Sequence, residues 1–130
     1  MSGCGVGFKL LQGLCIENEW DTTTLFDQLD LLAISIGADI VPVTGENRIL
    51  CYHGLQLLNR SPRLGVKEIL RVAKKNLPLN LTAVIFTIAP RINAAGRIHS
   101  GAKSVQLMIS SDLEELKSLA ASIEEDNLER

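Results

Sequence analysis

The sequence contains few aromatic residues and few cysteines. Only five of its 130 residues are aromatic, so any core that this chain builds must be mostly aliphatic. The cysteines, Cys4, Cys15 and Cys51, are odd in number, and no two of them form a Cys-x-x-Cys pair. This spacing excludes the common zinc and redox motifs. It predicts free thiols in a reducing compartment, and we therefore expect a cytoplasmic protein.

The sequence also lacks a long uninterrupted apolar run and a strong net charge. No apolar stretch is long enough to span a bilayer, and Lys9 interrupts the first one, so neither a membrane partner nor a secretory signal is expected. The formal net charge is -2, which gives no sign of nucleic-acid binding for the chain as a whole.

Local charge is more informative than the total. Residues 60–103 hold nine Lys or Arg residues and a single acid, Glu68. Residues 104–130 hold seven acids and two bases. This asymmetry predicts one basic surface that meets an anion and one exposed acidic helix.

Most apolar residues recur at helical spacing, which predicts a mainly α chain within one domain. An amphipathic helix starts almost at once, with no strand before it, and we expect a segment cut from a larger domain. Residues 81–88 are apolar and β-branched, so propensity allows strand or helix. Helix is favoured because no pairing strand is evident. The other predicted helices cover residues 6–14, 49–58, 66–74, 102–109 and 113–128, the last capped by Asp112.

The longest apolar stretch covers residues 29–43 and is interrupted by Asp30 and Asp39. We predict a helix ended by Gly37, then an extended piece ended by Pro42. Asp39 would lie at the break between two buried elements, where a carboxylate is costly unless a backbone amide, an arginine or a metal ion pairs with it. From the residues alone, a helix or turn cap is favoured for Asp39, because Asp prefers such positions.

Residues 89–97, APRINAAGR, place two arginines around small residues. Small residues let a ligand approach the backbone closely, and guanidinium groups suit bidentate contact with phosphate oxygens. The alternative is a pair of solvated arginines on a surface loop. The close recurrence of arginines and small residues slightly favours phosphate binding.

Three segments, GVGFKLLQ, LDLLAISIGADIVPVTGENRIL and IAPRINAAGRI, occur in this order. Together they resemble the RecJ family of single-strand-specific DNA exonucleases in the DHH phosphoesterase superfamily, over almost the whole chain. The resemblance implies Mn²⁺- or Mg²⁺-dependent hydrolysis of single-stranded DNA from the 5′ end, in repair and recombination. It implies an α/β parent domain whose sheet lies mainly outside this chain. Residues 1–110 would then be the C-terminal portion of the catalytic domain, and 111–130 the start of a long interdomain helix.

The resemblance also implies roles for particular residues. Asp39 matches the family's aspartate that binds the catalytic metal, whereas Arg91, Asn93 and Arg97 match positions along the path of the DNA backbone. The family's other metal ligands, an Asp-x-Asp segment, a further Asp and an Asp-His-His triplet, have no counterpart in this chain. The chain also departs from many relatives by having His99 and Ser100 where they have Gly-Asp. We therefore expect this chain alone to be inactive and to bind no metal.

Two other functions stay open at this point. Another DHH-type phosphoesterase could act on short oligonucleotides or cyclic dinucleotides. A non-enzymatic helical module could bind nucleic acid, with the motifs matching by accident. The expected partner is single-stranded DNA, and self-association through exposed apolar surface is expected as well.

Overall fold

The structure is a computed structural model that describes residues 1–98 and 101–129, apart from the side chains of Arg97 and Ile98. The described residues contain helices and no strand, which confirms the prediction of a mainly α chain. The helices in chain order are α1 (Gly3–Glu17), α2 (Thr23–Phe26), α3 (Leu29–Ala38), α4 (Gly45–Arg60), α5 (Leu64–Val72), α6 (Leu81–Ala83), the π-helix η1 (Val84–Ile88), α7 (Ala89–Ile98), α8 (Ala102–Ile109) and α9 (Leu113–Leu128).

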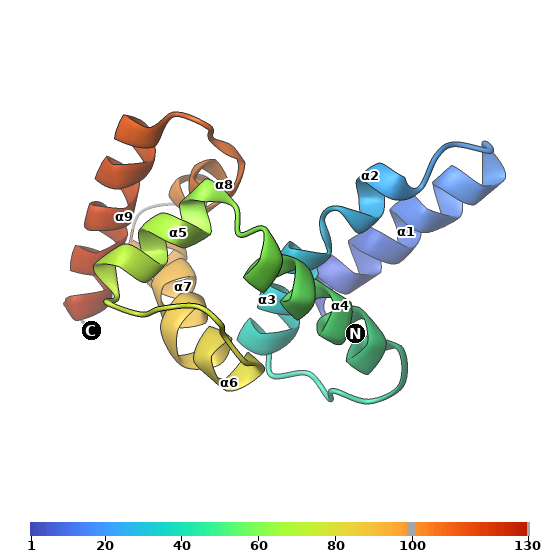
Figure 1. Cartoon of the computed structure of the whole chain (residues 1–130), viewed down its shortest axis with the longest axis horizontal. Helices are drawn as coiled ribbons and strands as arrows, with labels where there is room; N and C mark the ends of the chain where they lie inside the picture. Colours follow the sequence, from blue (N-terminus) through green and yellow to red (C-terminus); the bar gives the residue numbers. More distant parts are fainter. Residues whose placement is uncertain (99–100, 130) are drawn as a thin grey trace. The chain divides into compact units, whose positions relative to one another are not determined.

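The chain divides into two compact units, Met1–Ser61 and Pro62–Arg130. The first unit contains α1 to α4, which run from blue to green in Figure 1, and the second contains α5 to α9, which run from green to red. Of the described helices, none is long and apolar enough to cross a membrane.

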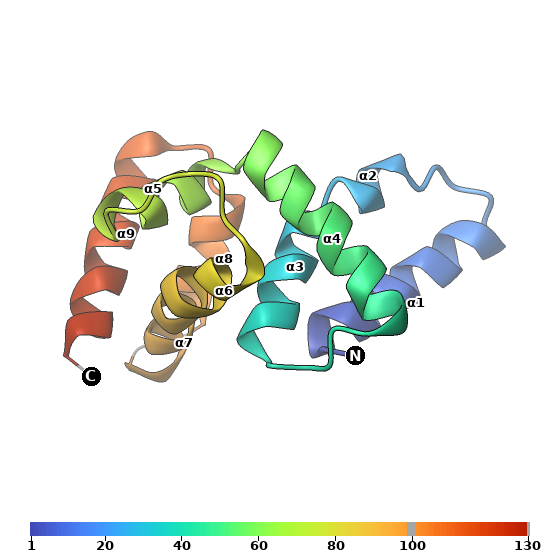
Figure 2. The same cartoon turned by 60° about the horizontal axis from the view of Figure 1, so that its bottom comes forward.

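A hairpin of α3 and α4 forms the centre of the first unit (Figure 2). Its helices approach closely because Gly54 of α4 lies against the α3 backbone. A Cβ added to Gly54 would lie 2.2 Å from the carbonyl oxygen of Leu29 and 2.7 Å from Cβ of Ala33. Seven of the ten residues of α3 are buried, including Leu32 and Ile36, so the first part of the apolar run forms a core helix as predicted.

Helix α1 packs on α3 with one face and leaves the other exposed. Phe8 is buried and meets the ring of Phe26 edge-on, with 5.9 Å between the ring centroids. On the opposite side, Val6 is 60% exposed and Leu10 is 65% exposed. An apolar face of this kind commonly contacts another protein surface. Self-association of this chain through it stays a prediction.

Helix α9 packs against both α5 and α7 in the second unit. As predicted, Asp112 caps α9: its carboxylate accepts the backbone N–H of Glu114 at 3.0 Å and that of Glu115 at 3.2 Å. Leu116 and Ile123 of α9 are fully buried. The role of residues 111–130 as an interdomain linker stays a prediction.

Residues 81–98 form one continuous helical segment with a widened turn in its middle. The helix predicted for residues 81–88 is confirmed, as α6 followed by the π-helix η1. Within η1, the N–H of Ala89 donates to the carbonyl of Val84, five residues back. Pro90 follows directly; it has no N–H, and its ring would clash with the carbonyl of Phe86 in a regular α-helix. The π turn lies where this clash would occur, and α7 continues beyond it.

Candidate functional site

Asp39 lies at the C-terminal end of α3 and is exposed. Its N–H donates to the carbonyl of Ser35 at 2.9 Å, and its Oδ2 accepts a hydrogen bond from Ser35 Oγ at 3.3 Å. The helix ends at Ala38, slightly later than predicted, and Ile40 follows with a left-handed φ of +51°. The expectation that Asp39 lies between two buried elements is wrong, because its side chain is exposed and the segment that follows α3 is not buried: Ile40 is 80% exposed. Burial therefore imposes no requirement for a partner.

The electrostatics of this position suit a cation better than a lone carboxylate. The last carbonyl groups of a helix carry partial negative charge, and a carboxylate beside them is repelled. The stabilising cap role of Asp belongs to helix N-termini, where its oxygens accept backbone N–H groups. Asp39 instead occupies the C-cap of α3, and the N-cap of the next helix is Thr44. A cation bound here would be attracted by both the carboxylate and the helix end.

Cys4 of α1 is a neighbour of Asp39 that the sequence did not predict. Partial burial is the main cause that raises the pKa of the Cys4 thiol, and the negative charge of Asp39 raises this pKa further. A hydrogen bond with Ser35 acts in the opposite direction. The first turn of α1 and the last turn of α3 therefore bring a thiol, a hydroxyl and a carboxylate together. No local pattern links residues this far apart in the chain.

This neighbourhood predicts that Asp39→Asn makes Cys4 more reactive. Because the thiolate is the nucleophile, removing the negative charge lowers the pKa of Cys4 and speeds its alkylation at pH 8. The expected gain in rate is modest, about twofold, because Coulomb interactions between solvated groups are weak. The raised pKa also means that Cys4 favours the folded state at lower pH. This contribution is lost as pH rises through the folded-state pKa.

Iodoacetamide labelling followed by trypsin digestion measures the reactivity of each cysteine separately. Cleavage after Lys9, Arg48 and Arg60 places Cys4, Cys15 and Cys51 on three different peptides. Asp27→Asn is the matched control, because Asp27 is also an exposed C-cap carboxylate of the first unit. Equal labelling rates for Cys4 in the Asp39 and Asp27 variants would show that Asp39 does not act on the thiol.

Arg91 makes three hydrogen bonds inside the second unit. Its Nε and Nη2 atoms donate to the carboxylate of Glu124 at 2.5 and 2.8 Å, and Nη1 donates to the carbonyl of Thr87 at 2.8 Å. The Arg91 side chain is only 12% exposed. The alternative of a solvated arginine on a loop is therefore wrong for this residue: it lies on a helix and binds α7 to α9. Removing one partner of so enclosed an ion pair destabilises the fold.

Asn93 and Arg97 lie four residues apart on α7, so their backbone positions share one side of the helix. Asn93 is exposed, whereas the side chain of Arg97 lies outside the described residues, as do His99 and Ser100. The intervening Ala94 and Ala95 are fully buried. Helical geometry thus separates Arg91, which faces α9, from the positions of the other two.

The four predicted residues are divided between the units. Asp39 belongs to the first unit, whereas Arg91, Asn93 and Arg97 belong to the second. Within the described part of the chain, no three His, Cys, Asp or Glu side chains lie close enough together to hold a metal ion. From this chain, Asp39 is thus a candidate for a single ligand of a larger site.

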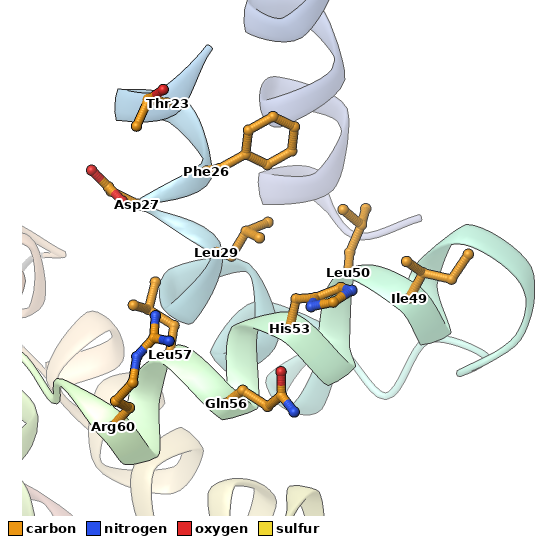
Figure 3. Close-up of a pocket in the computed structure, with 10 residues that line it drawn as sticks. All are labelled: Thr23, Phe26, Asp27, Leu29, Ile49, Leu50, His53, Gln56, Leu57 and Arg60. Carbon is orange, nitrogen blue, oxygen red and sulfur yellow. The ribbon is translucent and has the colours of Figure 1, made fainter.

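The first unit also contains an open groove of about 560 Å³ that the sequence did not predict. Figure 3 shows its lining side chains, which come from α2, the start of α3 and one side of α4. None of the four predicted site residues lines it. The helical spacing of the lining residues on α4 could have indicated that they share one side of that helix. The lining consists of Thr23, Phe26, Asp27, Leu29, Ile49, Leu50, His53, Gln56, Leu57 and Arg60.

Comparison with known proteins places this geometry in context. No family model matches the chain. Over its whole length, however, the chain is 41% identical to the single-stranded-DNA-specific exonuclease RecJ of Bacillus subtilis strain 168. It is 32% identical, again over its whole length, to the RecJ of Haemophilus influenzae. The chain spans only 16% and 24% of the lengths of these two relatives.

The fold agrees with the sequence match. The crystal structure of RecJ from Thermus thermophilus in complex with Mn²⁺ is similar with a TM-score of 0.84 and 30% identity, over 98% of this chain and 19% of that one. A structure of exonuclease RecJ bound to manganese gives the same TM-score and identity, over 98% of this chain and 32% of that one. These relatives form one class, the single-strand-specific exonucleases. The chain belongs to the RecJ family, as a segment of such a protein, which confirms the resemblance found in the sequence.

Proposed function

We propose that this chain is the part of a RecJ exonuclease that supplies one metal ligand and part of the path of the DNA backbone. The complete enzyme would hydrolyse single-stranded DNA from its 5′ end with Mn²⁺ or Mg²⁺, in cytoplasmic repair and recombination. The observation that carries this proposal is the 41% identity to a RecJ over the whole chain. The similarity to a Mn²⁺ complex of RecJ supports the choice of metal.

In this proposal Asp39 is the catalytic metal ligand. Its carboxylate is a hard oxygen donor of the kind that Mn²⁺ and Mg²⁺ prefer, and it is exposed at the negative end of α3. When bound, the metal would activate a water molecule and neutralise charge on the scissile phosphate. A complete site needs several more ligands, which we assign to other parts of the RecJ protein. The chain alone is therefore expected to be inactive.

Helix α7 would contact the phosphate backbone of the DNA strand. Asn93 is exposed on this helix and can donate to a phosphate oxygen, and Arg97 lies one turn further on. Arg91 has five N–H donors, of which three are engaged with Glu124 and Thr87. A phosphate that approaches Arg91 would compete with the Glu124 carboxylate. Contacts of this kind position the strand without reading its sequence.

This competition predicts that Glu124→Gln strengthens the binding of single-stranded DNA. The substitution removes the carboxylate that holds the Arg91 guanidinium and repels phosphate. We expect about a threefold to tenfold gain in affinity at low salt, because hydrogen bonds to charged groups contribute about 1.5–3 kcal/mol and only part of this is recovered. Fluorescence anisotropy of a labelled oligothymidylate measures the change, at a temperature where a thermal melt shows that the variant, which loses one partner of an enclosed ion pair, is folded.

Glu125→Gln is the matched control, since it removes the same charge from the neighbouring, exposed position of α9. It is expected to change affinity by less than about twofold, because an exposed carboxylate interacts with phosphate through water, where Coulomb energies are small. Arg97→Ala should weaken binding and make the salt dependence shallower by about 0.7. Equal affinities of the two glutamine variants would show that Arg91 does not contact the DNA. Unchanged binding by Arg97→Ala would show the same for Arg97.

A further inference from the structure

Helix α5 carries a basic face that the proposed site does not use. Lys67, Arg71 and Lys74 are spaced four and three residues apart, which places them along one side of the helix and the turn that follows it. All three are exposed, as is Lys75. The only acid in α5 is Glu68, whose buried carboxylate accepts a hydrogen bond from Arg71 Nε at 2.6 Å.

The stability of helix α5 does not account for this arrangement of basic residues. Bases in a last turn are favoured by the helix dipole, but Lys67 lies in the first half of α5, where the dipole does not favour a cation. Exposed lysines can be ordinary surface residues, so the conformation of Lys74 is the more telling observation.

Lys74 adopts a left-handed conformation, with φ of +53°. The N–H of Lys74 donates to the carbonyl of Arg71, and the N–H of Lys75 donates to that of Leu70 at 3.0 Å. These two bonds form a Schellman motif, in which the left-handed position is usually occupied by Gly. A lysine is conformationally less favourable than Gly at this position, so the geometry of the helix end does not explain why a charged residue occupies it.

Spaced point charges on an exposed helix suit an extended polyanion rather than a small anion. Four residues of an α-helix advance about 6 Å, close to the separation of successive phosphates in an extended strand. Lysine ammonium groups contact phosphate without demanding a particular geometry, so such a surface would be independent of base sequence. The relatives of this chain are named for their action on single-stranded DNA.

We propose that Lys67, Arg71, Lys74 and Lys75 form a second contact surface for the phosphate backbone of single-stranded DNA, separate from Asn93 and Arg97 on α7. This inference rests on the proposed function, because it takes its ligand from there. It assigns particular residues to the basic surface that the charge asymmetry of residues 60–103 predicted.

The test measures binding of a fluorescein-labelled oligothymidylate to the whole chain over a series of salt concentrations. The double variant Lys67→Gln/Lys74→Gly removes two charges from the surface. Gly at position 74 suits the left-handed backbone, so a thermal melt should show a fold at least as stable as that of the single variant Lys67→Gln. We expect affinity at low salt to fall at least about fivefold and the salt slope to become shallower by about 1.4, or 0.7 for each lost contact.

The control is Lys9→Gln/Arg48→Gln, which changes the net charge equally at two positions of the first unit. Lys9 is already paired with Glu46 at 2.6 Å and Arg48 is an exposed residue of α4, so less than about a twofold loss is expected. An equal loss of affinity in the control would show that binding depends on net charge alone and would overturn the inference.

Three further outcomes separate the two proposals. If the α5 double variant binds as the wild type does while Arg97→Ala binds more weakly, the α5 inference fails and the α7 path stands. If the wild-type chain does not bind the oligonucleotide at low salt, both fail. If polyglutamate binds as tightly as the oligonucleotide and is lost in the same variant, the surface recognises acidic protein and the DNA assignment is wrong.

Discussion

Asp39→Asn in a full-length RecJ that contains this segment is expected to abolish cleavage of single-stranded DNA while leaving the fold intact. Loss of residues that merely support metal ligands costs about 10- to 100-fold, so loss of a ligand itself should exceed about 100-fold. The amide has the same shape and can still accept the hydrogen bond from Ser35. A nuclease assay with Mn²⁺ measures the loss, and calorimetric titration with Mn²⁺ should show weaker metal binding.

In the 130-residue chain alone, which is expected to be inactive, the same substitution should not reduce stability. Because Asp39 lies at the negative end of α3, removing its charge should leave stability unchanged or raise it by about 0.3–1 kcal/mol. Asp27→Asn, at the exposed C-cap of α2, serves as the control in the nuclease assay and should leave cleavage intact. A fully active Asp39→Asn enzyme would end the assignment of Asp39 as a metal ligand.

Gly54→Ala is expected to be the most destabilising small substitution in the first unit. The new Cβ would lie 2.2 Å from the carbonyl oxygen of Leu29, a backbone atom that cannot move unless α3 and α4 separate. Overpacking of a core typically costs about 1–3 kcal/mol, and this clash with backbone should reach the upper end or exceed it. Denaturant unfolding followed by circular dichroism measures the loss.

Gly13→Ala is the matched control for this prediction. Gly13 is also within a helix, α1, but nothing lies within 4 Å of a Cβ added there. Alanine should therefore be neutral or stabilise the chain by about 0.5–1 kcal/mol through its helix propensity. If both alanine variants were equally stable, the close approach of α3 and α4 would not be required for folding.

The helical class of this protein could be predicted from its sequence because it depends on local interactions. The bounds of α8 and α9 were predicted correctly from spacing and from Asp112, which bonds to the backbone of the two residues after Leu113. Caps and periodicity act within one or two turns, so they can be read directly from neighbouring residues. The motif matches around Asp39 and Arg91 likewise placed the chain in the RecJ family.

The environments of the site residues, by contrast, depended on the tertiary structure. Arg91 could be recognised as a phosphate-binding type of residue, but its bonds to Glu124 join positions 33 residues apart. The position of Cys4 beside Asp39 joins the first helix to the third. The spacing of residues in the sequence shows which face of a helix a residue occupies, but it does not show which other helix that face packs against. That second choice is made when whole helices pack, through close approaches such as that of Gly54 to Leu29.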